Sequence, residues 1–171
     1  KYIMTSNEIL SGLKALSSEK YKANVVKLGI PEACSIGVST GDVRKLAKTV
    51  GKDNALAHDL WNTGYHEARL LAVLIVDKKQ FSLQEAEAFM HDVISWDLCD
   101  HLCKNLLIKL KGYEDLIEKW CDAEATYMKR AAFTLMASAA IHEKNLQKEA
   151  LDHYLSLIRT YSDDEREHVK K

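Results

Sequence analysis

Proline is almost absent from this chain, with one in 171 residues, and glycine occurs only seven times. So few turn-forming residues argue against an all-β fold. No stretch approaches the ~18 uninterrupted apolar residues of a transmembrane helix. The first residues, KYIMTSNEIL, also lack the basic and then apolar pattern of a signal peptide. We therefore expect a cytoplasmic protein without a membrane segment.

The four cysteines form no C-x-x-C pair, so reduced thiols are expected rather than disulfides. Cys99 and Cys103 lie one helical turn apart with His101 between them, but no second ligand pair completes a zinc site. The sequence also lacks a glycine-rich phosphate loop, a hydrolase nucleophile elbow and a dinucleotide fingerprint. We predict no metal and no cofactor.

Charge is nearly balanced, with a formal net charge of −1, which by itself argues against nucleic-acid binding. The distribution is uneven. Residues 1–52 carry nine Lys and Arg against four Asp and Glu, whereas the rest of the chain carries fifteen against twenty-one. The N-terminal third, at +5, could supply a basic surface for DNA, or these residues could be ordinary solvated helix faces.

Helical periodicity dominates what the sequence does contain, with 47% apolar and 29% charged residues. Polar caps and glycines separate the segments: Thr5 with Glu8 forms a capping box, Ser39 or Thr40 and Asp53 or Asn54 begin later helices, and Ser162 begins the last. One domain over residues 1–171 is expected, with about 10–11 helices at 5–16, 19–28, 41–51, 54–61, 66–76, 82–94, 96–111, 114–121, 126–141, 145–161 and 162–171.

Two segments suggest that these helices repeat in pairs. Residues 61–72 and 120–132 share the order Trp, polar turn, aromatic residue, basic residue and small apolar run. Arg69, Asp100 and Arg130 lie near the starts of alternate helices, 31 and 30 residues apart. Such a period predicts an all-α, right-handed superhelical solenoid of antiparallel HEAT-like helix pairs, in which equivalent early positions converge on one concave surface.

Five segments, in this order, resemble the AlkD-like alkylpurine DNA glycosylases. They are IGVSTGDVRKLAK (36–48), LWNTGYHEARLLA (60–72), SWDLCD (95–100), MKRAAF (128–133) and EHVKK (167–171). Each is weakly specific alone, whereas their order and spacing together are fairly specific. The family's last motif continues with a Trp beyond Lys171, where this sequence ends, so we expect the C-terminal end of the domain to be incomplete. The second helix, ANVVKL, lacks an aromatic residue that some relatives place near DNA.

The resemblance implies a DNA repair enzyme that removes alkylated purines from double-stranded DNA, and a monomer is our default expectation. It places Trp96, Asp100 and Arg130 at the family's catalytic and lesion-contacting positions. It also implies that the lesion is held against the concave face without deep base flipping. Further phosphate contacts are expected from basic residues on the helices, namely Arg44, Lys45, Lys48, Arg69 and Lys104.

The residues themselves leave structural alternatives open. Trp96, Asp100 and Cys103 share one helix face, separate from the Leu-rich core face. Asp100 could instead pair with Lys104 one turn later, and Trp96 could anchor the helix start in the core. Arg130, next to small residues that would let a DNA backbone approach, could instead form a salt bridge to Glu124 or to another repeat.

The chemistry of cationic purines suits this small set of residues. An N3- or N7-alkylated purine leaves as a neutral base, so the protein need not protonate it. A carboxylate such as Asp100 would stabilise the positive charge that develops on the sugar and orient water, and Trp96 would add a cation–π contact. Two other hypotheses remain: a non-catalytic HEAT-like module for DNA of unusual structure, and a protein-binding scaffold.

Overall fold

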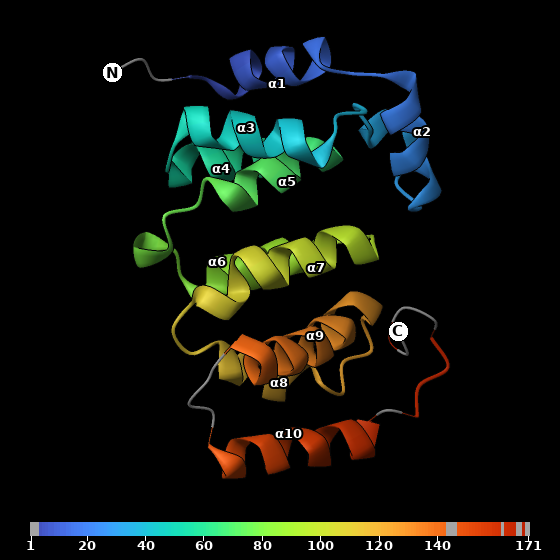
Figure 1. Ribbon diagram of the computed structural model, residues 1–171, viewed down its shortest axis with the longest axis vertical. Helices are drawn as coiled ribbons and strands as arrows, with labels where there is room; N and C mark the ends of the chain where they lie inside the picture. Colours follow the sequence, from blue (N-terminus) through green and yellow to red (C-terminus); the bar gives the residue numbers. More distant parts are fainter. Residues whose placement is uncertain (1–3, 143–146, 162, 167–168, 170–171) are drawn as a thin grey trace. The chain divides into compact units, whose positions relative to one another are not determined.

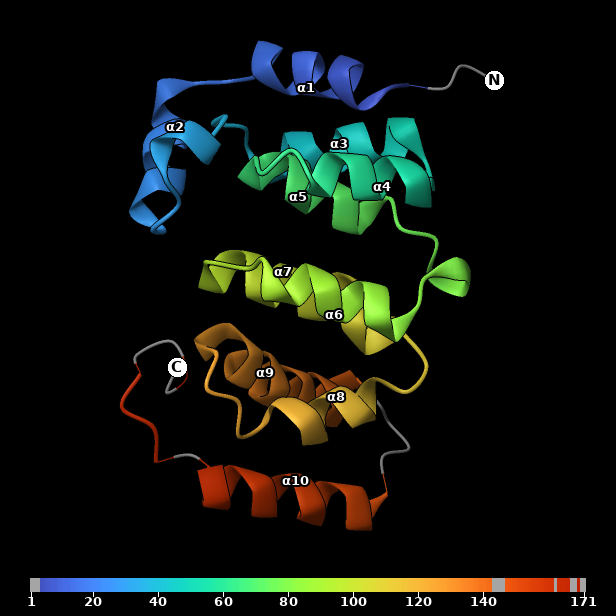
Figure 2. The same ribbon diagram turned by 180° about the vertical axis from the view of Figure 1, so that it is seen from behind.

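The computed structural model describes residues 4–142, 147–161, 163–166 and 169 (Figures 1 and 2). Within these ranges all regular secondary structure is helical, with ten α-helices and three short 3₁₀ turns. The all-α prediction is therefore confirmed. The chain divides into two compact units, Lys1–Ser82 and Leu83–Lys171, and each is described by itself.

The first unit contains five helices whose starts follow from polar capping residues. Thr5 forms the predicted capping box with Glu8, and the side chains of Ser18, Ser39 and Asp53 each accept a bond from a first-turn backbone N–H. These caps satisfy amide groups that have no partner inside the helix. The helices are α1 (Ser6–Ala15), α2 (Glu19–Lys27), α3 (Thr40–Val50), α4 (Asn54–Trp61) and α5 (His66–Leu74).

Helix α5 forms the centre of this unit. It packs most closely on α4 and α3, and α1 contacts both α4 and α5 (Figure 1). Helix α2 runs across the direction of the other helices of this unit (Figure 1), and Val25 is its one buried residue. Helix α5 ends at Leu74 and not at the expected residue 76, although Ile75 and Val76 are both fully buried.

A buried carboxylate ties the segment before α3 to the start of α5. Glu67 is fully buried, and its carboxylate accepts bonds from the backbone N–H groups of Ile36 at 3.0 Å, Gly37 at 2.7 Å and Val38 at 3.2 Å. Gly37 has a φ of +92°, and a Cβ there would lie 2.7 Å from the carbonyl oxygen of Ser18. Glu67 lies in the first turn of α5, but these partners come from another segment.

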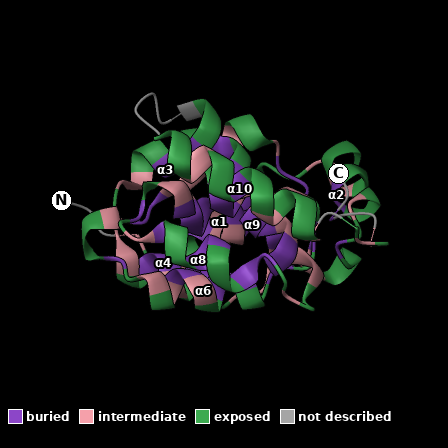
Figure 3. Ribbon diagram, turned by 90° about the horizontal axis from the view of Figure 1, so that it is seen from below, coloured by how far each residue is buried: buried purple, intermediate pink, exposed green. Residues whose placement is uncertain are grey.

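The second unit is built around α9. Helices α7 and α8 pack most closely on it, α6 and α10 contact it over fewer residues, and α10 stays largely exposed (Figure 3). Trp61 of the first unit and Trp120 of the second are almost fully buried, as expected for core residues. The helices are α6 (Leu83–His91), α7 (Trp96–Asn105), α8 (Tyr113–Trp120), α9 (Thr126–His142) and α10 (Lys148–Tyr161).

Helix α7 is shorter than expected, because the chain tightens into a 3₁₀ turn at Leu107–Lys109. The side chain of Asn105 donates to the carbonyl of His101, which competes with regular helix continuation. The tighter turn buries Leu107 and Leu110 together. Helix α6 likewise ends at His91, three residues before the expected end.

The eleventh helix expected after α10 does not begin where the sequence suggested. Its proposed cap, Ser162, lies outside the described residues, and residues 163–166 are not helical. This segment is instead bound to α9 and to the turn before it. Lys129 of α9 donates to Asp164 at 2.8 Å, and Arg166 donates both to Asp164 and to the carbonyl of Ala123 in that turn. The hydrogen bonds from Arg166 and then Lys129 hold the pKa of Asp164 well below its usual value.

Candidate functional site

Trp96, Asp100 and Arg130 come together on two packed helices of the second unit. Ser95 caps α7 through its hydroxyl, which accepts from the N–H of Leu98 at 3.2 Å, so Trp96 is the first helical residue and Asp100 follows one turn later. Arg130 extends from the neighbouring α9. Its Nε donates to Oδ1 of Asp100 at 2.9 Å and its Nη2 to Oδ2 at 2.8 Å. The same guanidinium lies 6.0 Å from the centroid of the Trp96 ring.

The cluster passes from solvent into the core along one face of α7. Trp96 is 38% exposed, whereas the side chains of Asp100 and Arg130 are 20% and 13% exposed. Cys103, the next residue on this face, is fully buried, and its Sγ lies 3.9 Å from the carbonyl oxygen of Ala131. The ion pair between Asp100 and Arg130 therefore packs against buried residues on one side. On its other side it is open to solvent beside the indole of Trp96.

The electrostatics keep Arg130 charged and Cys103 neutral. The hydrogen bonding that Arg130 donates to Asp100 raises the pKa of Arg130, more than burial lowers it. Burial raises the pKa of the Cys103 thiol well above its ordinary value, and interactions with Cys99 and then Asp100 raise it further. A thiol held in its neutral form is a poor nucleophile, so Asp100 is a better candidate for chemistry here than Cys103.

The structure decides between the alternatives that the sequence left open. Asp100 is held by Arg130 from another helix pair, rather than by a one-turn pair with Lys104. Arg130 thus forms the inter-repeat salt bridge that we considered, whereas the carbonyl of Glu124 accepts from Arg166. Trp96 is too exposed to be a core anchor.

The bidentate bond still leaves Asp100 capacity for a further partner. A carboxylate has about four acceptor positions on its two oxygens, and Arg130 occupies one on each. Since the guanidinium also fixes the rotamer, the remaining acceptor positions point in a defined direction. Such an arrangement can orient a water molecule or lie against a positively charged group.

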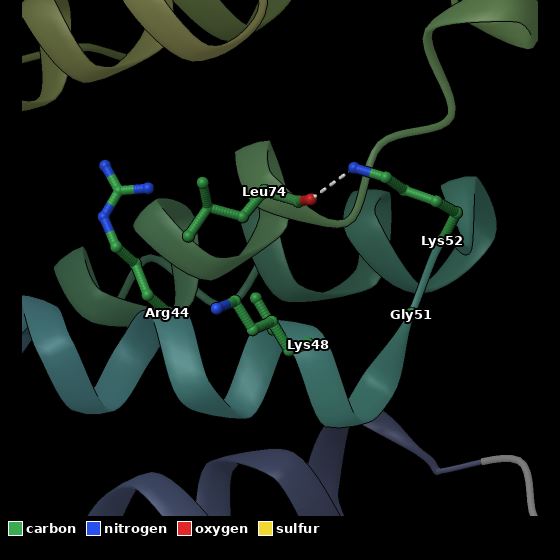
Figure 4. A pocket seen from close by; sticks show the side chains of 6 residues that line it. Arg44, Lys48, Gly51, Lys52 and Leu74 are labelled. Carbon is green, nitrogen blue, oxygen red and sulfur yellow. Dashed lines mark hydrogen bonds between the residues drawn. The ribbon is translucent and has the colours of Figure 1, made fainter.

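A second candidate surface lies in the first unit, where basic side chains line a cavity of about 520 Å³ (Figure 4). Arg44 and Lys48 lie one turn apart on α3, and Lys52 follows the end of that helix. The Nζ of Lys52 donates to the carbonyl of Leu74 at 2.8 Å. Within the described residues, no acidic side chain lines this cavity. It therefore suits an anion such as a phosphate.

The other predicted phosphate contacts are placed differently. Lys45 and Lys104 are exposed, and neither lines the cavity. Arg69 is half-buried: its Nε donates to the carbonyl of Trp61 at 3.1 Å, and its guanidinium lies 5.0 Å from that ring. Arg69 thus stabilises the turn between α4 and α5. Sequence reasoning missed Lys52, whose only signal was its position directly after the helix-ending Gly51.

Two further findings concern classes of function. Among the described residues, no three His, Cys, Asp or Glu side chains gather as a metal site would require. In the same part of the chain, no helix combines the length and the apolar character needed to cross a bilayer.

Comparison with known proteins gives a family and a fold. A family model described as "DNA alkylation repair enzyme" matches residues 9–171. No curated protein matches. A solved structure described as "A new family of proteins related to the HEAT-like repeat DNA glycosylases with affinity for branched DNA structures" matches with a TM-score of 0.86 and 20% identity. The match covers 98% of this chain and 72% of that chain, so the predicted HEAT-like architecture is confirmed.

Proposed function

The chain belongs to the family of DNA alkylation repair enzymes, and from this premise we propose that it is a DNA glycosylase for cationic alkylpurines. Its reaction is hydrolysis of the N-glycosidic bond of N3- or N7-alkylated purines in duplex DNA. The observation that carries the proposal is the cluster of Trp96, Asp100 and Arg130, in which an ion-paired carboxylate lies beside an exposed indole.

The bond changes explain why so few groups suffice. When the bond between C1′ and the purine nitrogen breaks, its electron pair goes to the base, which loses its positive charge and leaves neutral. The sugar becomes oxocarbenium-like, and a water molecule attacks C1′ and releases a proton. The protein must stabilise the developing sugar charge and position this water, both of which suit a preorganised carboxylate.

Asp100 would perform both tasks through the acceptor positions that Arg130 leaves open. Arg130 holds the carboxylate in place before DNA binds, which avoids reorganisation during the reaction. Its guanidinium uses two of its donors on Asp100, and its positive charge would attract a nearby phosphate. Trp96 would face the cationic base. The cation–π contact would favour the charged lesion over a neutral purine by about 0.5–2 kcal/mol.

DNA would also be bound by the first unit, through the cavity formed by Arg44, Lys48 and Lys52. The +5 balance of residues 1–52 provides a local basic potential that the near-neutral whole chain conceals. Contacts of this kind position the duplex and carry no sequence information. This matches a repair enzyme that must act at damage in any sequence.

The test is release of 7-methylguanine from methylated duplex DNA under single-turnover conditions. Wild-type protein should release the base, and Asp100→Asn should lower the rate constant by about 10²-fold or more, the usual effect of removing one electrostatic stabiliser. Asp97→Asn, on the same helix but outside the cluster, is the matched control and should retain the wild-type rate. Thermal unfolding of each variant separates loss of chemistry from loss of folding.

A second candidate function is non-catalytic binding of branched DNA. It is favoured by the description of the matching solved structure, which refers to affinity for branched DNA structures. Competition between a four-way junction and a methylated duplex of equal length would distinguish the two. Junction preference without base release by wild-type protein would refute the glycosylase proposal, while base release that is lost in Asp100→Asn would support it.

A further inference from the structure

A smaller cavity in the first unit is separate from the one bordered by Arg44, Lys48 and Lys52. Its volume is about 320 Å³, and the two cavities share no lining residue. It lies where the end of α1, the start of α2, the segment before α3 and the residue before α5 meet. The polar side chains used in the following argument are those of Lys14, Ser17, Lys22, Glu32, Ser35 and Tyr65.

Ser35 provides the first indication that this cavity is a binding site. Its side chain is buried, with only 6% of the residue exposed, and its Oγ has no hydrogen-bond partner among the described residues. Buried hydroxyl groups without a partner are uncommon, because desolvation is then uncompensated. A ligand with hydrogen-bond acceptors in the cavity would remove this penalty.

The charges around Ser35 indicate that the ligand is an anion. Lys14 and Lys22 both line the cavity, and the Nζ of Lys14 lies 5.3 Å from the centroid of the Tyr65 ring. Lys22 has one acidic neighbour, Glu32, at 3.7 Å. The Glu32 side chain is 78% exposed, and exposed ion pairs of this kind are weak. An anion inside the cavity would compete effectively for Lys22.

The wall of the cavity is rigid. Ile36 lines it, and the N–H groups of Ile36, Gly37 and Val38 are all bound to the buried Glu67 carboxylate. The hydroxyl of Ser17 donates to the carbonyl of Ile36. Ser35 directly precedes this held segment, so it needs little ordering when a ligand binds, which favours affinity.

We propose that this cavity binds a phosphate group through Lys14, Lys22 and the hydroxyl of Ser35. Two ammonium groups and a hydroxyl donor match the several acceptor oxygens of a phosphate. The group could belong to the DNA backbone or to a free phosphate-bearing molecule. The inference goes beyond base excision, because it holds whether or not the protein breaks a glycosidic bond.

The position of the cavity favours the DNA backbone as the source. Tyr65 directly precedes α5, and Leu74, which lines the other basic cavity, is the last residue of that helix. Nine residues of helix span about 13 Å. Successive phosphates of one strand rise about 3.4 Å along the duplex axis, so one strand crossing the surface of this unit could place phosphates roughly four steps apart in the two cavities.

The first experiment titrates isotope-labelled protein with inorganic phosphate at constant ionic strength and follows backbone amide shifts. Saturable shifts should centre on Ser17, Lys22 and Ser35. Ser35→Ala should weaken phosphate binding about tenfold, as expected for one hydrogen bond to a charged group, without lowering the thermal stability of the ligand-free protein. Lys22→Ala should weaken it at least as much, and Lys20→Ala, on the same helix but away from the cavity, should not.

Absence of saturable shifts, or equal affinity in wild type and the Ser35→Ala and Lys22→Ala variants, would overturn the proposal. The second experiment identifies the source from the salt dependence of binding to unmodified duplex DNA. If the cavity takes a backbone phosphate, Lys22→Ala should reduce the slope by about one relative to Lys20→Ala. An unchanged slope with phosphate binding retained in wild type would assign the cavity to a free phosphate-bearing molecule.

Discussion

Replacing the buried Glu67 by glutamine should lower the free energy of unfolding by about 3 kcal/mol. The carboxylate is fully buried and accepts three backbone bonds: Oε2 from Gly37 and Val38, and Oε1 from Ile36. Glutamine has nearly the same shape but only one acceptor oxygen. It can keep two of the bonds, now uncharged, and must turn its NH₂ group toward the third N–H.

The magnitude follows from these three bonds. The N–H of Ile36 would be buried without an acceptor, which costs about 1–3 kcal/mol. Each of the other two bonds would change from a charge-assisted to a neutral one, a loss of roughly 1 kcal/mol apiece at most. For a chain of this length, a total near 3 kcal/mol lowers the midpoint of thermal unfolding by about 6–12 °C.

Urea unfolding, followed both by circular dichroism and by tryptophan fluorescence, measures the effect. Glu19→Gln, an exposed residue in the first turn of α2, is the matched control and should change the free energy by no more than about 0.5 kcal/mol. Amide exchange at Ile36, Gly37 and Val38 should accelerate in Glu67→Gln. A loss no larger than that of the control would refute the idea that this carboxylate holds the segment before α3.

Three further outcomes are expected. Gly37→Ala should destabilise the protein by at least about 2 kcal/mol more than Gly29→Ala, since both have positive φ but only Gly37 has backbone within 3 Å of the added Cβ; equal urea midpoints would contradict this. Trp96→Ala should slow excision of a cationic purine about 2- to 30-fold with little change in thermal stability, because the indole is 38% exposed; an unchanged single-turnover rate would remove Trp96 from the site. Asp164→Asn should destabilise the protein at neutral pH and lose this effect in acid, because the folded-state pKa of Asp164 is lowered. That stability is complete above the unfolded pKa of about 3.9 and declines as pH falls below it, so unfolding measured at pH 7 and pH 2.5 checks the sign.

Much of the fold was accessible from local sequence, because caps and periodicity act within one helical turn. Thr5 with Glu8, Ser39, and Asp53 each begin a helix as expected. The predicted helix ends were wrong where packing against distant residues competes with local helix preference. Leu107 and Leu110 fit a continuous helix in the sequence pattern, but the core buries them after a 3₁₀ turn.

The candidate site was likewise predictable where it depends on local spacing and not where it depends on packing between helices. Trp96 and Asp100 could be placed on one helix face from their spacing alone, since four residues are nearly one turn. It could not choose the partner of Asp100, because Lys104 was equally available in the sequence. Only the packing of α7 on α9 brings Arg130 within 2.9 Å of that carboxylate. Pairing over 30 residues depends on the helix-pair stack and not on any local spacing, and the same is true of the bonds from Glu67 to the segment before α3.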